Sequence, residues 1–490
     1  MTMRFRIASI FIAAALVLSC GVLAAGHFSL YAQRDAVTLE ETTLLGNVSA
    51  AEGIRVGIRT ELMNQLFWDT QYTAGTSPAI HTDYTHYWSR QPNYWEWDRD
   101  WDVLQADYLG SYGVTDQEWE TEDKYGMQKP YNDVASRCPA GTENYTERVR
   151  LRDYYEYFPI YVSTADILPE DGGSYYLNDG ESVEMMMQDF LRSQFRFPVP
   201  EDLWIEISID KDPEGSVSSV GTSFFDDYSW EQLEISTIRT DAGLYFTLSP
   251  GKRADGTAPD FSHCTVERGL YFLPITLTPY EGEQPYKVYT TGNGEGIQQI
   301  SLDTEHFRTV CPIGADADRV FLLESEDEKW LYLLSQQGEE ATLTVLSAGT
   351  GEVTSCITLF TMKDPEEQYL SNVYVQEGYL VATLSDGLFS LATVDDAGRA
   401  EVALTGDFGP ALALECYMED PVFDYDGERL AFADFAQQFN GCSFFLGVVS
   451  DAGMEYLGKY FHNQDLAVMG YYGCSPVEQD PLTVHLPDDT

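Results

Sequence analysis

Basic residues are scarce in this chain of 490 residues, which has 28 Lys and Arg against 80 Asp and Glu and a formal net charge of -52. Nucleic acids are bound through Lys and Arg at their phosphates, so the shortage argues against a nucleic-acid-binding protein. An anionic lipid surface would also repel so acidic a body. Calcium, a cationic partner or plain solubility remain compatible with it, because net charge governs association rather than fold.

The familiar motifs of catalysis and metal binding are missing too. The sequence has no GxSxG nucleophile motif, no GxxxxGKS/T phosphate loop and no HExxH zinc motif, and its seven His are scattered. The sialidase-type pattern SxDxGxxW is also absent, since Ser223–Trp230 lacks its Gly. We therefore expect no cofactor and favour a binding module over an enzyme, with a glycan-acting hydrolase on the same scaffold as the alternative.

Cysteine is thinly spread. Cys20 lies in the apolar run described next, and the other seven Cys are scattered over the chain with no CxxC spacing. An odd number leaves at least one thiol unpaired. We expect these residues to be buried small side chains rather than a disulfide framework.

Long hydrophobic runs are absent with one exception, Ile7–Gly26, which carries no charge. Its length of about 20 residues matches a hydrocarbon layer of ~30 Å. Arg4 and Arg6 precede it, and basic flanks stay in the cytoplasm. The sequence thus predicts a single-pass protein of the cell membrane with an extracytoplasmic body. Its parts are a cytoplasmic stub over 1–6, a transmembrane helix over 7–26, a linker over 27–45 and the body over 46–490.

Two other interpretations of the same run stay open. Leu23–Ala25 offers small residues near a plausible cleavage point of a secretory signal. Val17–Cys20 loosely resembles the motif of a lipoprotein that is cut before Cys20.

An aromatic-rich insertion is expected near 81–131, which holds five of the chain's 9 Trp. In Trp95–Asp102 the acids occupy alternate positions and would share one face of a strand. Such a platform would stack sugar rings and accept their hydroxyl hydrogens, although the same aromatics also suit a packed core. The candidate ligand-binding residues are Trp88, Trp95, Trp97, Asp98, Asp100, Trp101 and Asp102.

A second, weaker candidate is a calcium site at Asp424, Asp426 and Glu428, since Ca²⁺ takes oxygen ligands. This segment does not complete the loop pattern DxD/NxD/NG. It lies where a hairpin turn is expected, and turn chemistry is the favoured interpretation.

Most of the body is predicted to be β. Ile54, Val56 and Ile58 alternate with polar or small residues, the period of a half-buried strand. Glu181–Phe195 has acids in its first turn, apolar residues at helical spacing, and Pro198 beyond it, which predicts a helix.

The second half repeats a small turn between β-rich runs. From the last Gly of one turn to that of the next, the spacings are 51, 57, 47 and 55 residues. This period, with about four strands per unit, is typical of propeller blades. The turns are Asp241–Gly243, Gly292–Gly294, Gly349–Gly351, Asp396–Gly398 and Asp451–Gly453.

The units around Gly387–Val402 resemble degenerate blades of the WD40, PQQ-like or YVTN-like propeller group. The resemblance runs from about Trp204 to Leu486 and implies a mainly β, propeller-like fold of about 6–8 blades, with no cofactor or activity attached. Thr483–Leu486 would then be a last strand that closes the ring beside Ile54. The whole layout is similar to membrane-anchored surface proteins of Gram-positive gut bacteria.

These observations predict a membrane-anchored extracytoplasmic binding protein whose ligand the sequence does not name. Its expected contacts are the membrane through Ile7–Gly26 and a glycan or an envelope protein, without nucleic acid. An accessory subunit or sensor of an envelope complex would have the same sequence features.

Overall fold

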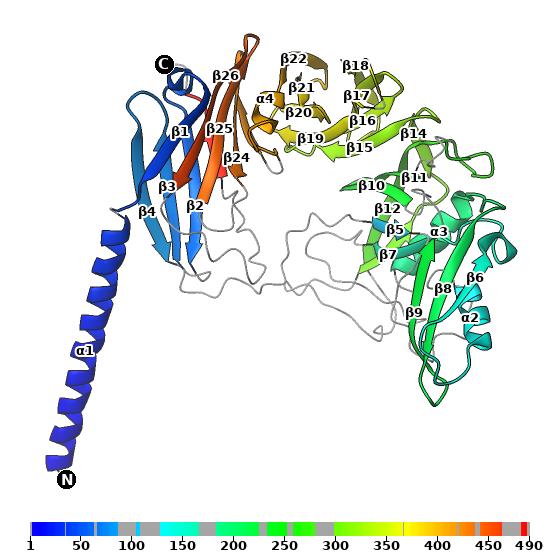
Figure 1. The fold of residues 1–490 in the computed structure, drawn as a ribbon, viewed down its shortest axis with the longest axis horizontal. Coiled ribbons are helices and arrows are strands. Elements are labelled where there is room, and N and C mark those ends of the chain that lie inside the picture. Colours follow the sequence, from blue (N-terminus) through cyan, green and yellow to red (C-terminus); the bar gives the residue numbers. More distant parts are fainter. Residues whose placement is uncertain are drawn as a thin grey trace. The chain divides into compact units, whose positions relative to one another are not determined.

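The chain is mainly β, with its strands arranged in antiparallel sheets (Figure 1). The computed structural model describes residues 2–34, 36–62, 66–86, 104–107, 128–165, 183–224, 233–251, 258–279, 298–365, 367–418, 421–436, 442–462 and 482–487. The chain splits into two compact units. The first consists of Met1–Arg99, Asp386–Leu391 and Ala403–Thr490, and the second of Asp100–Ser385 and Ala392–Val402.

The first unit contains two sheets and the N-terminal helix α1, Thr2–Arg34. One sheet has the order β1-β26-β25-β24-β23, with β1 Leu39–Gly46, β23 Val422–Tyr425, β24 Arg429–Ala436, β25 Cys442–Ser450 and β26 Gly453–His462. The other has the order β27-β2-β3-β4, with β2 Arg55–Leu62, β3 Leu66–Thr73, β4 Ala79–His86 and β27 Leu482–His485. The short helices η1 and α4 span Val48–Ala51 and Gly409–Leu412.

The predicted pairing between the two ends of the chain is confirmed. Strand β27 lies antiparallel to β2, with Val484 opposite Val56 and Leu482 opposite Ile58. These four residues are 0–3% exposed and share one core with the other sheet of the unit. Ile54 is also fully buried, as its alternation predicted.

The range 27–45, predicted to be a linker, contains the end of α1 and most of strand β1. The polar composition of Leu39–Gly46 concealed this strand, because its acids lie at a sheet edge that is open to water. Glu41 nevertheless accepts hydrogen bonds from the hydroxyls of Tyr456 at 3.0 Å and Tyr72 at 3.3 Å. Tyr456 in turn contacts Tyr460 at 2.5 Å, so β1 is fastened to both sheets.

The second unit begins with an α/β region. Its elements are β5 Leu104–Asp107, α2 Gln128–Arg137, β6 Tyr145–Arg150, η2 Leu151–Asp153, β7 Tyr161–Ala165, α3 Val183–Gln194, β8 Trp204–Lys211 and β9 Val217–Phe224. Helix α3 confirms the helix predicted at Glu181–Phe195. Helix α2 was not predicted, because only Tyr131, Val134 and a few neighbours form its narrow buried side.

Four-stranded and five-stranded sheets follow in chain order. One sheet contains β10 Leu233–Thr240, β11 Gly243–Pro250, β12 Gly269–Pro279, β13 Gln298–Leu302 and β14 Arg308–Pro312. The next has the order β15 Asp318–Glu324, β16 Trp330–Gln337, β17 Glu340–Ser347 and β18 Val353–Thr361. Another has the order β19 Leu370–Gln376, β20 Tyr379–Leu384, β21 Leu388–Val394 and β22 Ala400–Asp407.

The repeated turns fall where the sequence placed them. Asp241–Gly243 joins β10 to β11, and Asp451–Gly453 joins β25 to β26. Gly349–Gly351 and Asp396–Gly398 likewise lie between paired strands, with positive φ at Gly351 and Gly398. The turn predicted at Gly292–Gly294 lies outside the described residues. Four strands per repeat are thus confirmed in two successive sheets, while the closed ring and its number of blades stay predictions.

Among the residues that the structure describes, no helix combines the length and the mean hydropathy that crossing a membrane requires. The helical conformation of Ile7–Gly26 is confirmed within α1, but its assignment as a transmembrane helix finds no support there.

Replacement of Leu482 by Ala tests the junction of the chain ends. Because Leu482 is 1% exposed, we expect a loss of about 2–5 kcal/mol in the unfolding free energy of the first unit, measured by urea denaturation. Ile80→Ala is the matched control, since Ile80 is 40% exposed in the same sheet and should cost less than about 1 kcal/mol. Equal losses of unfolding free energy for Leu482→Ala and Ile80→Ala would contradict a stabilising role of the β2-β27 pairing.

Candidate functional site

The aromatic platform predicted from the sequence lies outside the described residues. Strand β4 ends at His86, and the next described strand, β5, begins at Leu104. All seven candidate residues fall between these strands, so their role in ligand binding stays a prediction. They are Trp88, Trp95, Trp97, Asp98, Asp100, Trp101 and Asp102.

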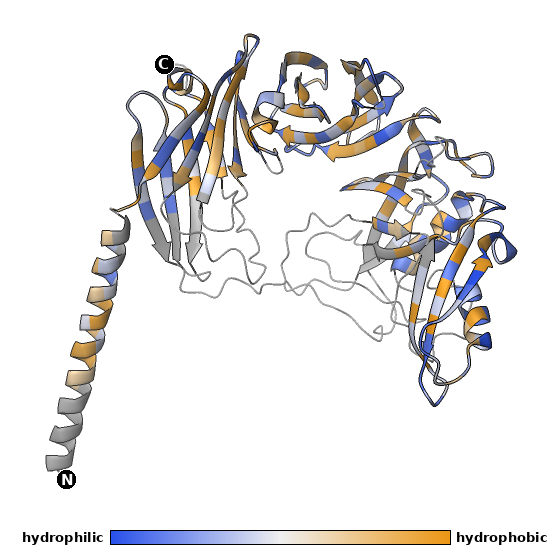
Figure 2. Cartoon of the chain, in the orientation of Figure 1, coloured by the Kyte–Doolittle hydropathy of each residue, from blue (hydrophilic) through white to orange (hydrophobic). Residues whose placement is uncertain are grey.

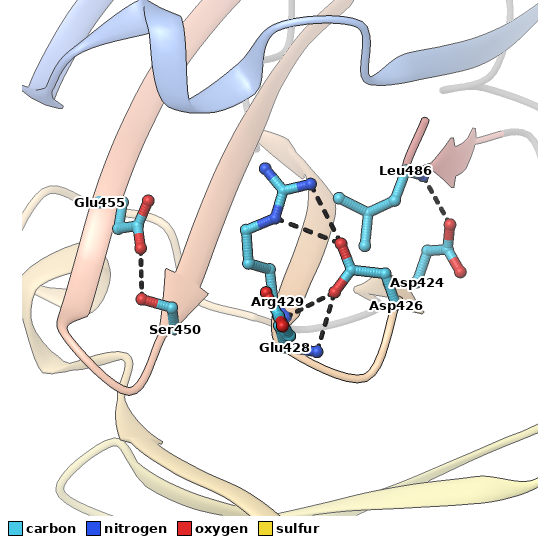
Figure 3. A network of polar contacts seen from close by, with 7 residues as sticks. All are labelled: Asp424, Asp426, Glu428, Arg429, Ser450, Glu455 and Leu486. Carbon is cyan, nitrogen blue, oxygen red and sulfur yellow. Dashed lines mark hydrogen bonds and ion pairs between the residues drawn. The ribbon is translucent and has the colours of Figure 1, made fainter. Parts of the chain in front are cut away.

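The calcium candidates lie in the hairpin between β23 and β24 (Figure 3). Asp426 accepts hydrogen bonds from the backbone N–H groups of Glu428 at 2.9 Å and Arg429 at 2.7 Å. Its second oxygen accepts from Nε and Nη2 of Arg429 at 3.2 and 3.0 Å. Burial raises the pKa of Asp426, but these N–H groups and the guanidinium together outweigh it and lower the pKa.

Asp424 also serves the fold. Its Oδ2 accepts the backbone N–H of Leu486 at 2.6 Å, which fastens the segment after β27 to β23 (Figure 3). Within the described part of the chain, no three His, Cys, Asp or Glu side chains converge as metal ligands. Asp424 and Asp426 thus hold backbone groups, as expected of turn residues, and calcium binding at this hairpin stays an untested prediction.

A polar hollow of about 320 Å³ lies at the end of the β6-β8-β9 sheet, lined by Asn144, Asp210, Lys211 and Asp212 among others. Asp210 accepts the backbone N–H of Asn144 and the hydroxyl of Ser219, each at 2.5 Å. The Asn144 N–H, followed by the Ser219 hydroxyl, lowers the pKa of Asp210. Both carboxylate oxygens thus accept hydrogen bonds within the protein.

A better candidate is the seam formed by β10, β15 and β19, the first strands of three successive sheets. In the second unit β15 packs against both β10 and β19 (Figure 1). The seam is not purely apolar: Leu322 and Ile238 are buried, whereas charged side chains stand at the strand ends. Because each strand begins its own sheet, three sheets contribute side chains to one surface.

A mixed-charge cluster stands at one end of this seam. Glu234 on β10 interacts electrostatically with Arg268, which precedes β12, and with Asp318 and Arg319 on β15. Arg268 is only 8% exposed and donates from Nη1 to the carbonyls of Gly314 at 3.2 Å and Ala315 at 2.9 Å. Burial is the first cause of both pKa shifts: it raises the pKa of Glu234 and lowers that of Arg268.

The cluster continues toward β19. Arg319 has φ of 49°, a left-handed conformation that is uncommon for a side chain this large, and its guanidinium lies 4.5 Å from the centre of the Tyr369 ring. Asp316 accepts a 2.7 Å hydrogen bond from Nε2 of Gln337. Buried Gln336 accepts the N–H of Leu370 at 2.9 Å and so ties β16 to β19.

Glu324 is the last residue of β15. Like Glu234 on β10, it has a raised pKa. Burial, and then the nearby charge of Glu328, raise the pKa of Glu324 to about 7. Perturbed carboxyl groups gather at functional sites more than elsewhere, so the seam is the candidate site of the described chain. It presents donors and acceptors of both charges, which suits recognition of a polar ligand.

Sequence reasoning missed the seam because its charged residues are far apart along the chain. Glu234, Arg268 and Asp318 belong to three separate segments, and none sits in a motif. The local signal was the acidic pair Asp316 and Asp318, which the sequence offered only as a weak calcium candidate with turn chemistry as the favoured interpretation.

The cysteines only partly follow their prediction. Cys138 and Cys416 are buried and Cys264 and Cys311 are half-buried, but Cys356 is exposed. All five are free thiols.

No protein-family model and no curated protein matches the chain. The solved structures that resemble it include the β-propeller domain of Swd1 from Myceliophteria thermophila, at 8% identity over 67% of this chain and 98% of that one, with a TM-score of 0.23. A putative 6-phosphogluconolactonase from Bacteroides uniformis has 12% identity over 62% and 92% of the two chains and a TM-score of 0.21. TolB from Acinetobacter baumannii has 10% identity over 84% and 81%, with a TM-score of 0.18.

TM-scores this low carry no conclusion about topology, ligand or activity. A β-propeller domain stands among the structural neighbours, and the chain is mainly β with many antiparallel sheets. The mainly β class is confirmed, and the closed propeller stays a prediction.

Asp426→Asn tests the hairpin in the first unit. We expect a loss of about 1 kcal/mol at neutral pH, because a charge-assisted contact is removed from a partly buried pair. The lowered pKa means that this stabilisation is present above the ordinary Asp pKa of 3.8 and disappears as the pH falls through the lower folded value. Melting curves between pH 3 and 7 measure the difference.

We further expect the same Tm with calcium as with a chelator, and a calcium-dependent rise that Asp426→Asn abolishes would contradict this assignment.

Glu324→Gln tests the seam. A carboxyl whose pKa is raised in the folded state binds its proton more tightly there, so its contribution to stability falls as the pH rises from about 4.5 to about 7. The variant should lack this fall, visible as a flatter dependence of Tm on pH over that interval. Glu352→Gln, at an exposed position, is the control and should keep the wild-type slope. Identical slopes for all three proteins would show that Glu324 does not titrate as described.

Proposed function

We propose that the protein is a membrane-held binding protein whose β body lies outside the cytoplasm. The observation that carries this proposal is the exposed apolar surface of α1. Its large hydrophobic side chains are 60–73% exposed at Leu16, Val17, Leu18, Val22, Leu23 and Phe28. Figure 2 shows the middle of α1 mainly in the colours of hydrophobic residues.

Lipid is the environment that relieves this exposure. Burial of apolar surface is favourable by about 25 cal/mol per Å², and a helix satisfies its own backbone hydrogen bonds in hydrocarbon. The absence of a spanning helix applies to described residues, and the side chains before Ala13 are not among them. Arg4 and Arg6 favour a cytoplasmic N-terminus, which leaves the acidic body on the other side.

The seam of β10, β15 and β19 is the proposed binding surface. Its guanidinium and carboxyl groups lie together, so a ligand with both hydrogen-bond donors and acceptors, such as a glycan or a polar segment of an envelope protein, matches it.

Membrane attachment is tested by cell fractionation. The full chain should pellet with membranes and resist a carbonate wash, whereas the double variant Leu18→Lys/Val22→Lys should move largely to the soluble fraction, because Lys near the centre of a lipid-embedded helix costs about 2.5–3.5 kcal/mol. Val353→Lys is the control, since Val353 is 49% exposed on the β body and should leave the distribution unchanged.

Two outcomes would overturn the proposal. A wild-type chain found in the soluble fraction would remove the membrane attachment. Release of product from a panel of chromogenic glycosides, lost in Glu324→Gln, would replace the binding protein with the hydrolase alternative, since a carboxyl with a pKa near 7 suits a general acid.

A further inference from the structure

A cluster of sulfur and carboxylate groups lies beneath the surface of the first unit, between α4 and β24. Cys416, Met418 and Asp434 are 0%, 4% and 2% exposed. The Sγ of Cys416 lies 3.8 Å from the Sδ of Met418 and 4.0 Å from Oδ2 of Asp434. The backbone N–H of Met418 donates to the same Oδ2 at 3.0 Å. Three side chains of different chemistry therefore meet in one buried place.

The backbone around Cys416 adopts left-handed conformations at two residues. Glu415 and Met418, on either side of Cys416, have φ of 67° and 54°, although neither is Gly. Left-handed conformations of such residues cost about 1–2 kcal/mol each and tend to occur where function requires them. The N–H of Cys416 is held by the carbonyl of Ala411 at 3.2 Å, so the bend starts directly after α4.

The ligand types point to a soft monovalent metal ion. Thiolate and thioether sulfur select Cu(I) over harder cations. Two sulfur atoms 3.8 Å apart can both lie about 2.3 Å from one ion, a usual metal–sulfur distance. The Asp434 carboxylate adds a second negative charge to that of the Cys416 thiolate. Together the two groups outweigh the single positive charge of the bound ion.

We propose that Cys416, Met418 and Asp434 form a binding site for Cu(I). Binding replaces the thiol proton of Cys416 with the metal and releases that proton to solvent, with no change of oxidation state. Tyr417 is 57% exposed and Leu414 is 37% exposed, so residues next to Cys416 in the chain reach solvent.

The test is a competition for Cu(I) between the purified full chain and bicinchoninate under anaerobic conditions. The wild type should withhold one equivalent of Cu(I) per chain, and Met418→Leu, which preserves the apolar volume, should weaken the affinity at least tenfold. Met187→Leu and Cys138→Ser are matched controls, because both residues are buried away from this cluster in the second unit. Both controls should bind Cu(I) as the wild type does.

X-ray absorption of the loaded wild type should show two sulfur neighbours near 2.3 Å, one fewer in Met418→Leu. Cys416→Ser is included with circular dichroism as a check of folding; if it unfolds, Met418→Leu alone decides. Failure of the wild type to compete for Cu(I), or equal affinity of the wild type and Met418→Leu, would overturn the site.

Discussion

The pairing of strands from the two ends of the chain is the constraint on which the first unit depends. Strand β27 pairs with β2 at one edge of the β27-β2-β3-β4 sheet. Strand β1 pairs with β26 and forms one edge of the sheet that contains the β25-β26 hairpin. Both pairings must form after the whole chain is present, and each closes a very long loop. Their cost in chain entropy grows only slowly with that length, so buried contacts such as Val56 with Val484 suffice to offset it. The hydrogen bond that the Leu486 N–H donates to the Asp424 carboxylate also holds the segment after β27 to another strand of this unit.

The large acidic excess is therefore not a single surface with a single role. Asp426, Asp210 and Asp395 have lowered pKa values because turns and neighbouring Arg, Ser or backbone N–H groups hold them in the charged form. Glu234 and Glu324, on the first strands of their sheets, have raised pKa values because neighbouring protein removes part of their water, although Glu234 is still exposed and Glu324 is only half-buried. The acids with lowered pKa values therefore stabilise turns, whereas those with raised values are available to bind a proton or a ligand. It also explains why a count of carboxylates in the sequence singles out no site.

The two proposed sites differ in how the fold makes them. The seam gathers charges from two sheets and the Tyr369 ring from a third through packing of β10, β15 and β19, so its geometry depends on how sheets stack within one unit. The Cys416 cluster is local, since two of its members are two residues apart and the third comes from the adjacent β24. A strained bend at Glu415 and Met418 creates it, and periodicity in the sequence carries no sign of such a bend.

The sequence by itself determined many of the strands, four of the five repeated turns and helix α3, because alternation, Gly at positive φ and helical spacing are properties of neighbouring residues. It also anticipated that Thr483–Leu486 pairs with the strand beginning near Ile54. Only the tertiary structure decided that β1 is a strand, since its burial comes from Tyr72 and Tyr456 rather than from its own polar residues. The same holds for Glu234 and Arg268, and for Cys416 and Asp434, because each pair comes together from separate segments of the chain.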